Sequence, residues 1–372
     1  MEGGIFLSAK IINYFACANS ALGFVSFFED NIKELDRLYI LKGGPGTGKS
    51  TLMKSIGSEW YNRGFDVEYI HCASDNDSID GVIVPSLGIG VVDGTSPHII
   101  EPKAPGAIED YVNLGIAWDS NRLSAHKNEI LAIKSKISAC YSNTYNQFKE
   151  ALKIHDEWEK IYLDNIDFNI LNEVTASTID KLFGYNNIDK KSIVKNRFFG
   201  GATPKGPVNF VMNLTEDIEK RYFIKGRPGC GKSTMLKKIA LAAESKGYNV
   251  EIYHCGFDPN SLDMVIIREL GIAVFDSTAP HEFFPNRESD EIIDMYYLAI
   301  NPGTDEEYQH QLNEISYSYK IAINNGIRYL NDAKQLHDEL ENIYIDAMDF
   351  NIVNKITQEL KAKLDDYFFS LG

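Results

Sequence analysis

The stretch RLYILKGGPGTGKST, from Arg37 to Thr51, decides how this chain is expected to fold. A β-type run at its start leads into a glycine-rich turn, and the turn leads into a helix-forming segment. The turn matches the pattern G-x-x-x-x-G-K-[ST], which surrounds phosphate groups with backbone N–H groups, a lysine and a hydroxyl. The pattern returns as GRPGCGKST at Gly226–Thr234, behind the β-type run Arg221–Ile224. Two occurrences with the same flanks argue against a chance glycine-rich turn.

Both turns are predicted to hold the phosphates of a nucleoside triphosphate. Glycines let successive backbone N–H groups converge on an anion, and the following helix adds the positive end of its dipole. Lys49 and Lys232 are expected to contact the β- and γ-phosphates and to act in catalysis, while the hydroxyls of Ser50 and Ser233 ligate Mg²⁺. The predicted nucleotide-binding residues are Gly43, Gly44, Pro45, Gly46, Thr47, Gly48, Lys49, Ser50 and Thr51, together with Gly226, Arg227, Pro228, Gly229, Cys230, Gly231, Lys232, Ser233 and Thr234.

The two turns belong to an internal duplication. Shifting the sequence by 183 residues (226 − 43) lays the first turn on the second, and 30 of 66 positions are identical between residues 37–102 and 220–285. A chain of 372 residues is long enough for two domains. The predicted domains are residues 1–190, with a core at about 10–118 and a helical arm at about 119–182, and residues 191–372, with a core at about 193–301 and an arm at about 302–367.

The order of elements in each core predicts an α/β fold. After the helix that follows the first turn come a β-rich run at Val67–Cys72, a turn and N-cap at Asp75–Ser78 that opens a short helix or turn through Val84, and a buried strand at Leu87–Asp93. Strands that alternate with helices are typical of a parallel sheet with helices on both faces. Ligands bind such sheets at the carboxyl ends of the strands.

Asp93 and Asp276 are the expected Mg²⁺ partners. Each ends a run of apolar residues beside a predicted phosphate turn, where a carboxylate can hold the metal directly or through water. A turn-forming aspartate is the alternative interpretation, because Gly94 and Ser277 follow.

His98 and His281, in the segments DGTSPH and DSTAPH, are predicted to polarise the γ-phosphate or to transfer a proton. A histidine that tethers its loop is the alternative. Asp80 and Asp263 could orient a water or a substrate hydroxyl. Zinc at the two His-Cys dipeptides is disfavoured, because each half offers only one other retained histidine nearby.

Beyond about Asp119 the apolar residues recur every three or four positions, which predicts a helix of about 35 residues in each arm. The segments Asp167–Asn169 and Asp349–Asn351 should end these helices and start shorter ones that pack back, so that each core carries a helical hairpin arm. Most of the apolar stripe is expected to be ordinary core. A protein-partner or dimer seam is the alternative, and the two arms could also pack against each other.

Composition narrows the function classes. A net charge of −16 disfavours a broad nucleic-acid surface, since such binding relies on clustered Lys and Arg. Five cysteines without regular spacing indicate a reducing compartment, and the cytoplasm is the expected location. No run reaches the roughly 18 apolar residues that span a bilayer, so no membrane association is expected.

Over the turns and the strands ending at Asp93 and Asp276, each half resembles the P-loop NTPase superfamily. The whole chain is similar to a family of bacterial tandem P-loop ATP-binding proteins, on the segments GGPGTGKST, IHCASDNDSIDGVIVP, VVDGTSPH, GATPKG, GRPGCGKST and DSTAPH. The resemblance implies two tandem P-loop NTPase domains that bind ATP and Mg²⁺. No N-K-x-D segment appears, which favours ATP over GTP, and no glutamate follows Asp93 or Asp276, which favours slow turnover over a motor.

The leading hypothesis is an ATPase that hydrolyses ATP slowly and couples nucleotide state to the arrangement of its two domains. A small-molecule or nucleotide kinase is the alternative, and a non-hydrolysing, nucleotide-stabilised scaffold is the third hypothesis. Differences between the copies suggest one catalytic and one regulatory site, with Arg227, Arg268 or Arg287 as a candidate arginine finger.

Overall fold

The computed structural model describes residues 9–279 and 282–371, which divide into two compact units. Among these residues, unit 1 contains 9–14, 31–141 and 330–371, and unit 2 contains 15–30, 142–279 and 282–329. The boundary predicted between residues 190 and 191 lies inside unit 2. The compact units and the sequence repeats therefore divide the chain at different places.

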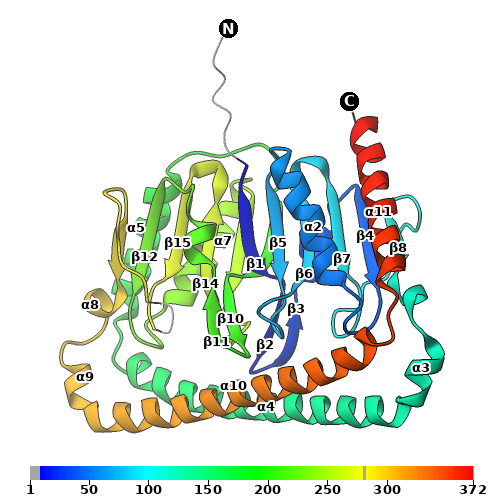
Figure 1. The fold of residues 1–372 in the computed structure, drawn as a ribbon. Coiled ribbons are helices and arrows are strands. Elements are labelled where there is room, and N and C mark those ends of the chain that lie inside the picture. The colour runs from blue at the N-terminus through cyan, green and yellow to red at the C-terminus, as the bar shows by residue number, and fades with distance from the viewer. Residues whose placement is uncertain (1–8, 280–281, 372) are drawn as a thin grey trace. The chain divides into compact units, whose positions relative to one another are not determined.

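The sheet strands of unit 1 follow the order β1-β5-β6-β7-β4-β8 (Figure 1). Strand β4 runs parallel to β7 and β8, whereas β6 runs antiparallel to β5 and β7. The bounds are β1 (Ile11–Phe15, whose last residue is grouped with unit 2), β4 (Arg37–Lys42), β5 (Val67–His71), β6 (Ile79–Val84), β7 (Ile89–Asp93) and β8 (Glu109–Asn113).

Unit 2 repeats this arrangement in the order β16-β12-β15-β14-β13-β9. Strand β12 is parallel to β15 and β16, and β14 is antiparallel to both of its neighbours. The bounds are β9 (Val194–Phe198), β12 (Lys220–Lys225), β13 (Val250–His254), β14 (Leu262–Ile267), β15 (Ile272–Asp276) and β16 (Glu291–Asp294), with the hairpins β2 (Cys17–Ser20) to β3 (Gly23–Ser26) and β10 (Gly200–Thr203) to β11 (Gly206–Asn209).

The helices of unit 1 are α2 (Lys49–Asn62), α3 (Ser120–Ala125) and α11 (Phe350–Ser370), with the 3-10 turns η1 (Pro85–Leu87) and η2 (Leu114–Ala117). Those of unit 2 are α5 (Phe168–Phe183), α6 (Val211–Leu214), α7 (Lys232–Ser245), α8 (Met295–Ala299) and α9 (Thr304–Glu307), with η3 (Arg268–Leu270). Three helices contain residues of both units: α1 (Phe28–Ile32), α4 (Lys127–Leu163) and α10 (Gln309–Ile345).

Strand β6, and its counterpart β14 in unit 2, contradict two predictions: a helix or turn in this segment, and parallel pairing throughout the sheet. The segment ending at Val84 was expected to be a helix or turn in a wholly parallel sheet, yet it is a fully buried antiparallel strand. The carboxylate of Asp75 accepts hydrogen bonds from the backbone N–H of Asp77 and the hydroxyl of Ser78, which makes a tight turn. Residues 72–78 are too few for a parallel crossover, so the chain reverses. The sheet is therefore mixed, although its pairing around β4 and β12 is parallel.

The apolar face of the unit 1 sheet is covered by α2 and α11. Leu52 and Met53 of α2 and Val353, Leu360 and Leu364 of α11 belong to one buried cluster with the strands. In unit 2 the equivalent cluster contains α7 together with α5, for example Leu171 and Leu182. Hence each core is completed by the shorter helix from the other repeat's arm.

The arm helices begin and end close to the predicted positions. Asp167 and Asp349 cap α5 and α11 by accepting hydrogen bonds from backbone N–H groups of the first turn. The main contacts of α5 are with α7 and α8 in unit 2, so it does not pack back along α4 as the predicted hairpin requires. Burial of its apolar face against a sheet explains this, because a long helix alone offers too narrow a surface.

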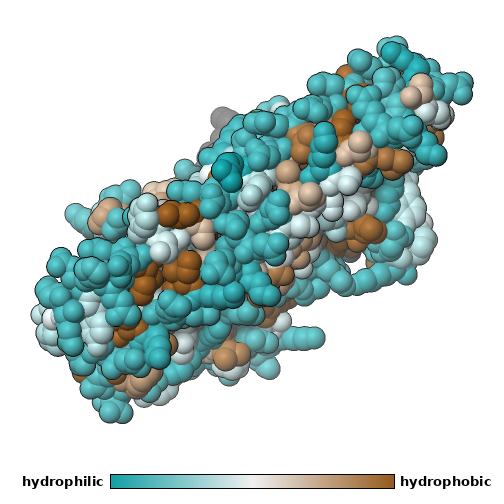
Figure 2. Space-filling model, turned by 90° about the horizontal axis from the view of Figure 1, so that it is seen from below, coloured by the Kyte–Doolittle hydropathy of each residue, from teal (hydrophilic) through white to brown (hydrophobic). Residues whose placement is uncertain are grey.

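The long helices α4 and α10 contact each other within each unit. In unit 1, Ile130 and Ile133 of α4 pack with Leu340 of α10. In unit 2, the hydroxyl of Thr144 donates to the carbonyl of Gly326 at 3.3 Å, and the ring of Phe148 lies where a Cβ on Gly326 would be. The exposed sides of these helices are mostly hydrophilic, with scattered hydrophobic residues (Figure 2). Within residues 9–279 and 282–371, no helix combines the length and apolar character needed to cross a membrane.

The exchange of short helices predicts where a core mutation acts. Leu364→Ala in α11 should lower the free energy of unfolding by about 2–5 kcal/mol, because it opens a cavity at a buried leucine. Hydrogen exchange should accelerate in α2 and not in α7. Leu182→Ala in α5 is the matched control and should accelerate exchange in α7. Faster exchange in α7 with Leu364→Ala would contradict the assignment.

Candidate functional site

The first glycine-rich segment, residues 43–51 (loop 1), connects the carboxyl end of β4 to the start of α2. Gly46 and Gly48 have φ values of 66° and 82°, which side chains other than glycine rarely adopt. Residues 226–234 (loop 2) connect β12 to α7 in the same way, with φ values of 77° at Gly229 and 81° at Gly231. Both loops therefore present the first N–H groups of a helix at the carboxyl edge of a sheet.

Each loop lysine lies between carbonyl oxygens and an aspartate. The ammonium of Lys49 donates to the carbonyls of Gly43 at 3.1 Å and Gly44 at 2.8 Å, and it lies 3.5 Å from Oδ2 of Asp93. The ammonium of Lys232 donates to the carbonyls of Gly226 and Arg227 and lies 3.7 Å from Oδ2 of Asp276. Both units thus bring together the lysine and aspartate that the sequence predicted. The parallel pairing of β7 with β4, and of β15 with β12, causes this.

The two aspartates are oriented by the threonines that follow them. Oδ1 of Asp93 accepts from the backbone N–H and the hydroxyl of Thr95 at 2.9 and 2.6 Å. Asp276 has the same two contacts with Thr278, at 3.0 and 2.6 Å. In each case the other carboxylate oxygen, Oδ2, faces the lysine.

The predicted metal-binding serines are tethered to the strand beside them. Oγ of Ser50 accepts from the N–H of Ile79 at 3.1 Å, and Oγ of Ser233 accepts from the N–H of Leu262 at 2.9 Å. Serine and aspartate oxygens at one edge are the donors that Mg²⁺ prefers. These residues fit a magnesium–phosphate group, since the loop offers N–H donors, an ammonium and oxygen ligands together.

An acid lies next to each lysine–aspartate pair, and it is buried in unit 1 and partly buried in unit 2. Asp80 is 6% exposed, and its Oδ1 lies 3.9 Å from Nε2 of His98. Burial raises the pKa of the Asp80 carboxyl; His98 opposes the rise and Asp93 adds to it. For Asp263, burial and then the charge of Asp276 raise the pKa to about 8. His98 is therefore placed beside the buried acid, whereas His281 lies outside the described residues.

The histidines of the two His-Cys dipeptides contact equivalent asparagines, Asn13 and Asn196, which lie 183 positions apart (196 − 13). Nε2 of His71 lies 2.8 Å from Oδ1 of Asn13, and the ring of His254 is bound by Asn196 and the carbonyl of Pro259. Burial lowers the pKa of His71 to about 4, with a smaller effect from Lys54.

The candidate arginine fingers are each held inside unit 2. Arg227 donates to Oδ2 of Asp305 at 2.8 and 3.1 Å. Arg268 binds Glu251 at 2.7 Å, and Arg287 donates to backbone carbonyls of Ile218 and Glu216.

The loops also differ at one internal position. In loop 1 the hydroxyl of Thr47 donates to the carbonyl of Gly44 at 2.9 Å. In loop 2 the thiol of Cys230 is buried and accepts from the N–H of Arg227 at 3.2 Å. The side chain at this position therefore stabilises the turn as a hydrogen-bond donor in loop 1 and as an acceptor in loop 2.

Sequence reasoning missed a charged segment on each long helix. His155-Asp-Glu-Trp-Glu159 of α4 and His337-Asp-Glu-Leu-Glu341 of α10 share the pattern H-D-E-x-E. Oε1 of Glu341 accepts from the backbone N–H of Gly46 at 3.2 Å. The backbone oxygen of Glu159 lies 2.5 Å from where a Cβ on Gly229 would be. Comparing the arms at an offset of 182 (337 − 155) rather than 183 would have revealed the repeated pattern.

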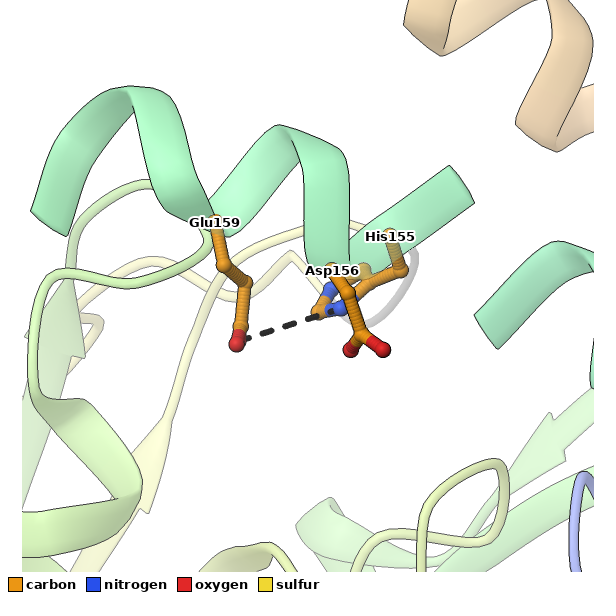
Figure 3. Close-up of side chains that lie close together, drawn as sticks. All are labelled: His155, Asp156 and Glu159. Atoms are coloured by element: carbon orange, nitrogen blue, oxygen red, sulfur yellow. Dashed lines mark ion pairs between the residues drawn. The ribbon is translucent and has the colours of Figure 1, made fainter. Parts of the chain in front are cut away.

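Each segment gathers three side chains that could hold a cation. Figure 3 shows His155, Asp156 and Glu159 on α4, with Nδ1 of His155 3.8 Å from Oε1 of Glu159. One ligand atom from each lies within 4.8 Å of the others, as it does for His337, Asp338 and Glu341. Burial lowers the pKa of His155, which favours the neutral imidazole. Near Asp338, the ammonium of Lys334 already supplies a positive charge.

The chain was compared with protein-family models, curated proteins and solved structures, and none of them matched. The interpretation of the two loops therefore rests on their sequence and geometry.

The raised pKa of Asp263 predicts a pH-dependent stability. The folded protein keeps this carboxyl protonated up to about pH 8, while the unfolded chain ionises it near pH 4. Its contribution to folding is present below pH 4 and is lost as the pH rises through 8. Asp263→Asn should therefore gain up to about 4 kcal/mol over wild type between pH 5 and pH 8, at about 1.4 kcal/mol per pH unit.

Urea unfolding of metal-free protein at the two pH values measures this gain. The exposed Asp189→Asn is the control and should show no such change. If the free energies of unfolding of Asp263→Asn and wild type differed by the same amount at pH 5 and pH 8, the raised pKa of the Asp263 carboxyl would be contradicted.

Proposed function

We propose that loop 1 and loop 2 each bind the phosphates of ATP with Mg²⁺, and that the protein slowly hydrolyses ATP. The observation that carries the proposal is the lysine held between loop carbonyls and an aspartate at the end of the adjacent parallel strand. It occurs in both units with lysine–aspartate distances of 3.5 and 3.7 Å. A polyanion needs such a positive charge beside converging N–H groups.

The residues of each unit have separate tasks in this proposal. Lys49 and Lys232 exchange their carbonyl contacts for phosphate oxygens, and the glycines admit the phosphates close to the backbone. Ser50 with Asp93, and Ser233 with Asp276, hold Mg²⁺, which neutralises charge on the phosphates when bound. Asp80 and Asp263 lie beside these pairs and can hold a proton, so they suit the transfer of a proton from the attacking oxygen.

The long helices support a coupling between nucleotide state and domain arrangement. Residues of α10 contact loop 1, and residues of α4 contact loop 2. Each of these helices also contributes residues to the other unit. A change at either loop would therefore act on a helix that both units share.

A small-molecule or nucleotide kinase is the second candidate. The pKa of Asp263, about 8, would also suit a base that accepts a proton from an acceptor hydroxyl.

Separate Lys49→Ala and Lys232→Ala variants test the proposal. Each should weaken Mg-ATP binding at its own loop by about 10- to 100-fold, because a charge-assisted contact is lost. Isothermal titration calorimetry measures the affinities. Lys54→Ala and Lys238→Ala change exposed lysines on α2 and α7 and should leave binding unchanged.

Product analysis separates the candidate reactions. Phosphate release from ATP alone supports the hydrolase, whereas ADP formed only with an added acceptor supports the kinase. A raised melting temperature without turnover supports the scaffold. Absence of Mg-ATP binding to the wild-type chain would refute all three.

A further inference from the structure

Loop 1 already holds an anion from within the chain. The carboxylate of Glu341 accepts a hydrogen bond from the backbone N–H of Gly46, with 3.2 Å between the heavy atoms. This N–H belongs to the loop that the proposed function assigns to phosphate. A carboxylate and a phosphate oxygen cannot both occupy one donor, and their like charges repel.

The contact between Glu341 and Gly46 depends on close packing of the α10 backbone against loop 1. A Cβ on Gly46 would lie 2.9 Å from the backbone oxygen of Glu341 and 2.9 Å from Cγ1 of Ile345. Gly44 lies against the rings of Trp118 and Tyr344, which also contact each other. Because α10 approaches the loop this closely at several points, the position of Glu341 is fixed by the helix.

Loop 2 offers an internal comparison. Glu159 is the counterpart of Glu341, and its backbone oxygen lies even closer to its loop, 2.5 Å from where a Cβ on Gly229 would be, against 2.9 Å for Glu341 and Gly46. Over the described residues, however, its carboxylate makes no hydrogen bond to loop 2, and its Oε1 lies 3.8 Å from Nδ1 of His155. Glu341 has the same histidine available, since Nδ1 of His337 lies 3.9 Å from its Oε1. The same Oε1 atom thus lies between the Gly46 N–H and the imidazole of His337.

We propose that Glu341 competes with phosphate for loop 1 and so determines which of the two loops binds nucleotide more tightly. In the nucleotide-free protein its carboxylate occupies the Gly46 N–H. A triphosphate enters loop 1 only when this carboxylate leaves, whereas in loop 2 the Glu159 carboxylate does not compete for the loop N–H groups. This inference rests on the proposed nucleotide binding and assigns the two loops different affinities.

The test measures each loop separately with the non-hydrolysable analogue Mg-AMP-PNP and calorimetry. In a Lys232→Ala background, which silences loop 2, Glu341→Gln should tighten binding about 10- to 100-fold, the equivalent of a hydrogen bond to a charged group. Glutamine keeps the size of the side chain and removes its charge, and its neutral amide oxygen is a weaker acceptor for the Gly46 N–H. The matched variant, Glu159→Gln in a Lys49→Ala background, should change binding less than about threefold.

Two controls locate the effect. Adding Lys49→Ala to the Glu341→Gln, Lys232→Ala protein should abolish the gain, because the gain belongs to loop 1. Melting temperatures of the variants should stay within a few degrees of the parent, which shows that α10 remains folded.

Equal or weaker binding after Glu341→Gln would overturn the inference, and so would an equal gain from Glu159→Gln. If AMP-PNP binds both loops without any effect of Glu341, the proposed function stands and only the competition fails. If no variant and no parent binds AMP-PNP, both the proposed function and this inference are wrong.

Discussion

The close packing of a long helix against a glycine at the tip of each loop is the contact on which the rest of each unit depends. At Gly46 and Gly229 the helix backbone lies where any Cβ would collide with it. Such an approach leaves no room for the helix to slide or rotate. It fixes the place of the charged segment on the helix, and it fixes where the chain turns into the short helix that covers the sheet. Gly46 and Gly229 thus determine where the charged segment lies beside each loop and where the short helix begins to cover the sheet.

Much of this arrangement could be predicted because its determinants are local. A strand, a glycine-rich turn and a helix follow one another within about 25 residues, and parallel neighbours end at the same edge of a sheet. The Lys49–Asp93 pair follows from these two facts. Strand β6 could not be predicted in this way, because Asp75–Ser78 suits a helix cap and a hairpin turn equally well. Burial of residues 79–84 within the sheet decides between them, and burial is not visible in a single sequence.

The partners of the arms could not be predicted for a different reason. Both cores present similar apolar faces, with Leu52 and Met53 in one and Met235 and Leu236 in the other. The stripe on α11 would fit either face, so periodicity alone cannot choose. The proximity of Glu341 to loop 1 was missed because it links residues almost 300 positions apart. Repetition of H-D-E-x-E was the available signal, although it gives the residues and not the loop that each contacts.

Each sheet is covered by a helix that belongs to the other repeat, and this bears on how such a chain could arise. A polypeptide with a single repeat would keep only one of the two helices that cover its sheet, α2 or α7, and its own short helix would lack the sheet that it covers here. Two copies could satisfy both needs by exchanging those helices, as domain-swapped dimers do. Joining the copies end to end would then turn a concentration-dependent association into an intramolecular one. Once the copies are joined in one chain, each can change independently, so the two loops could diverge.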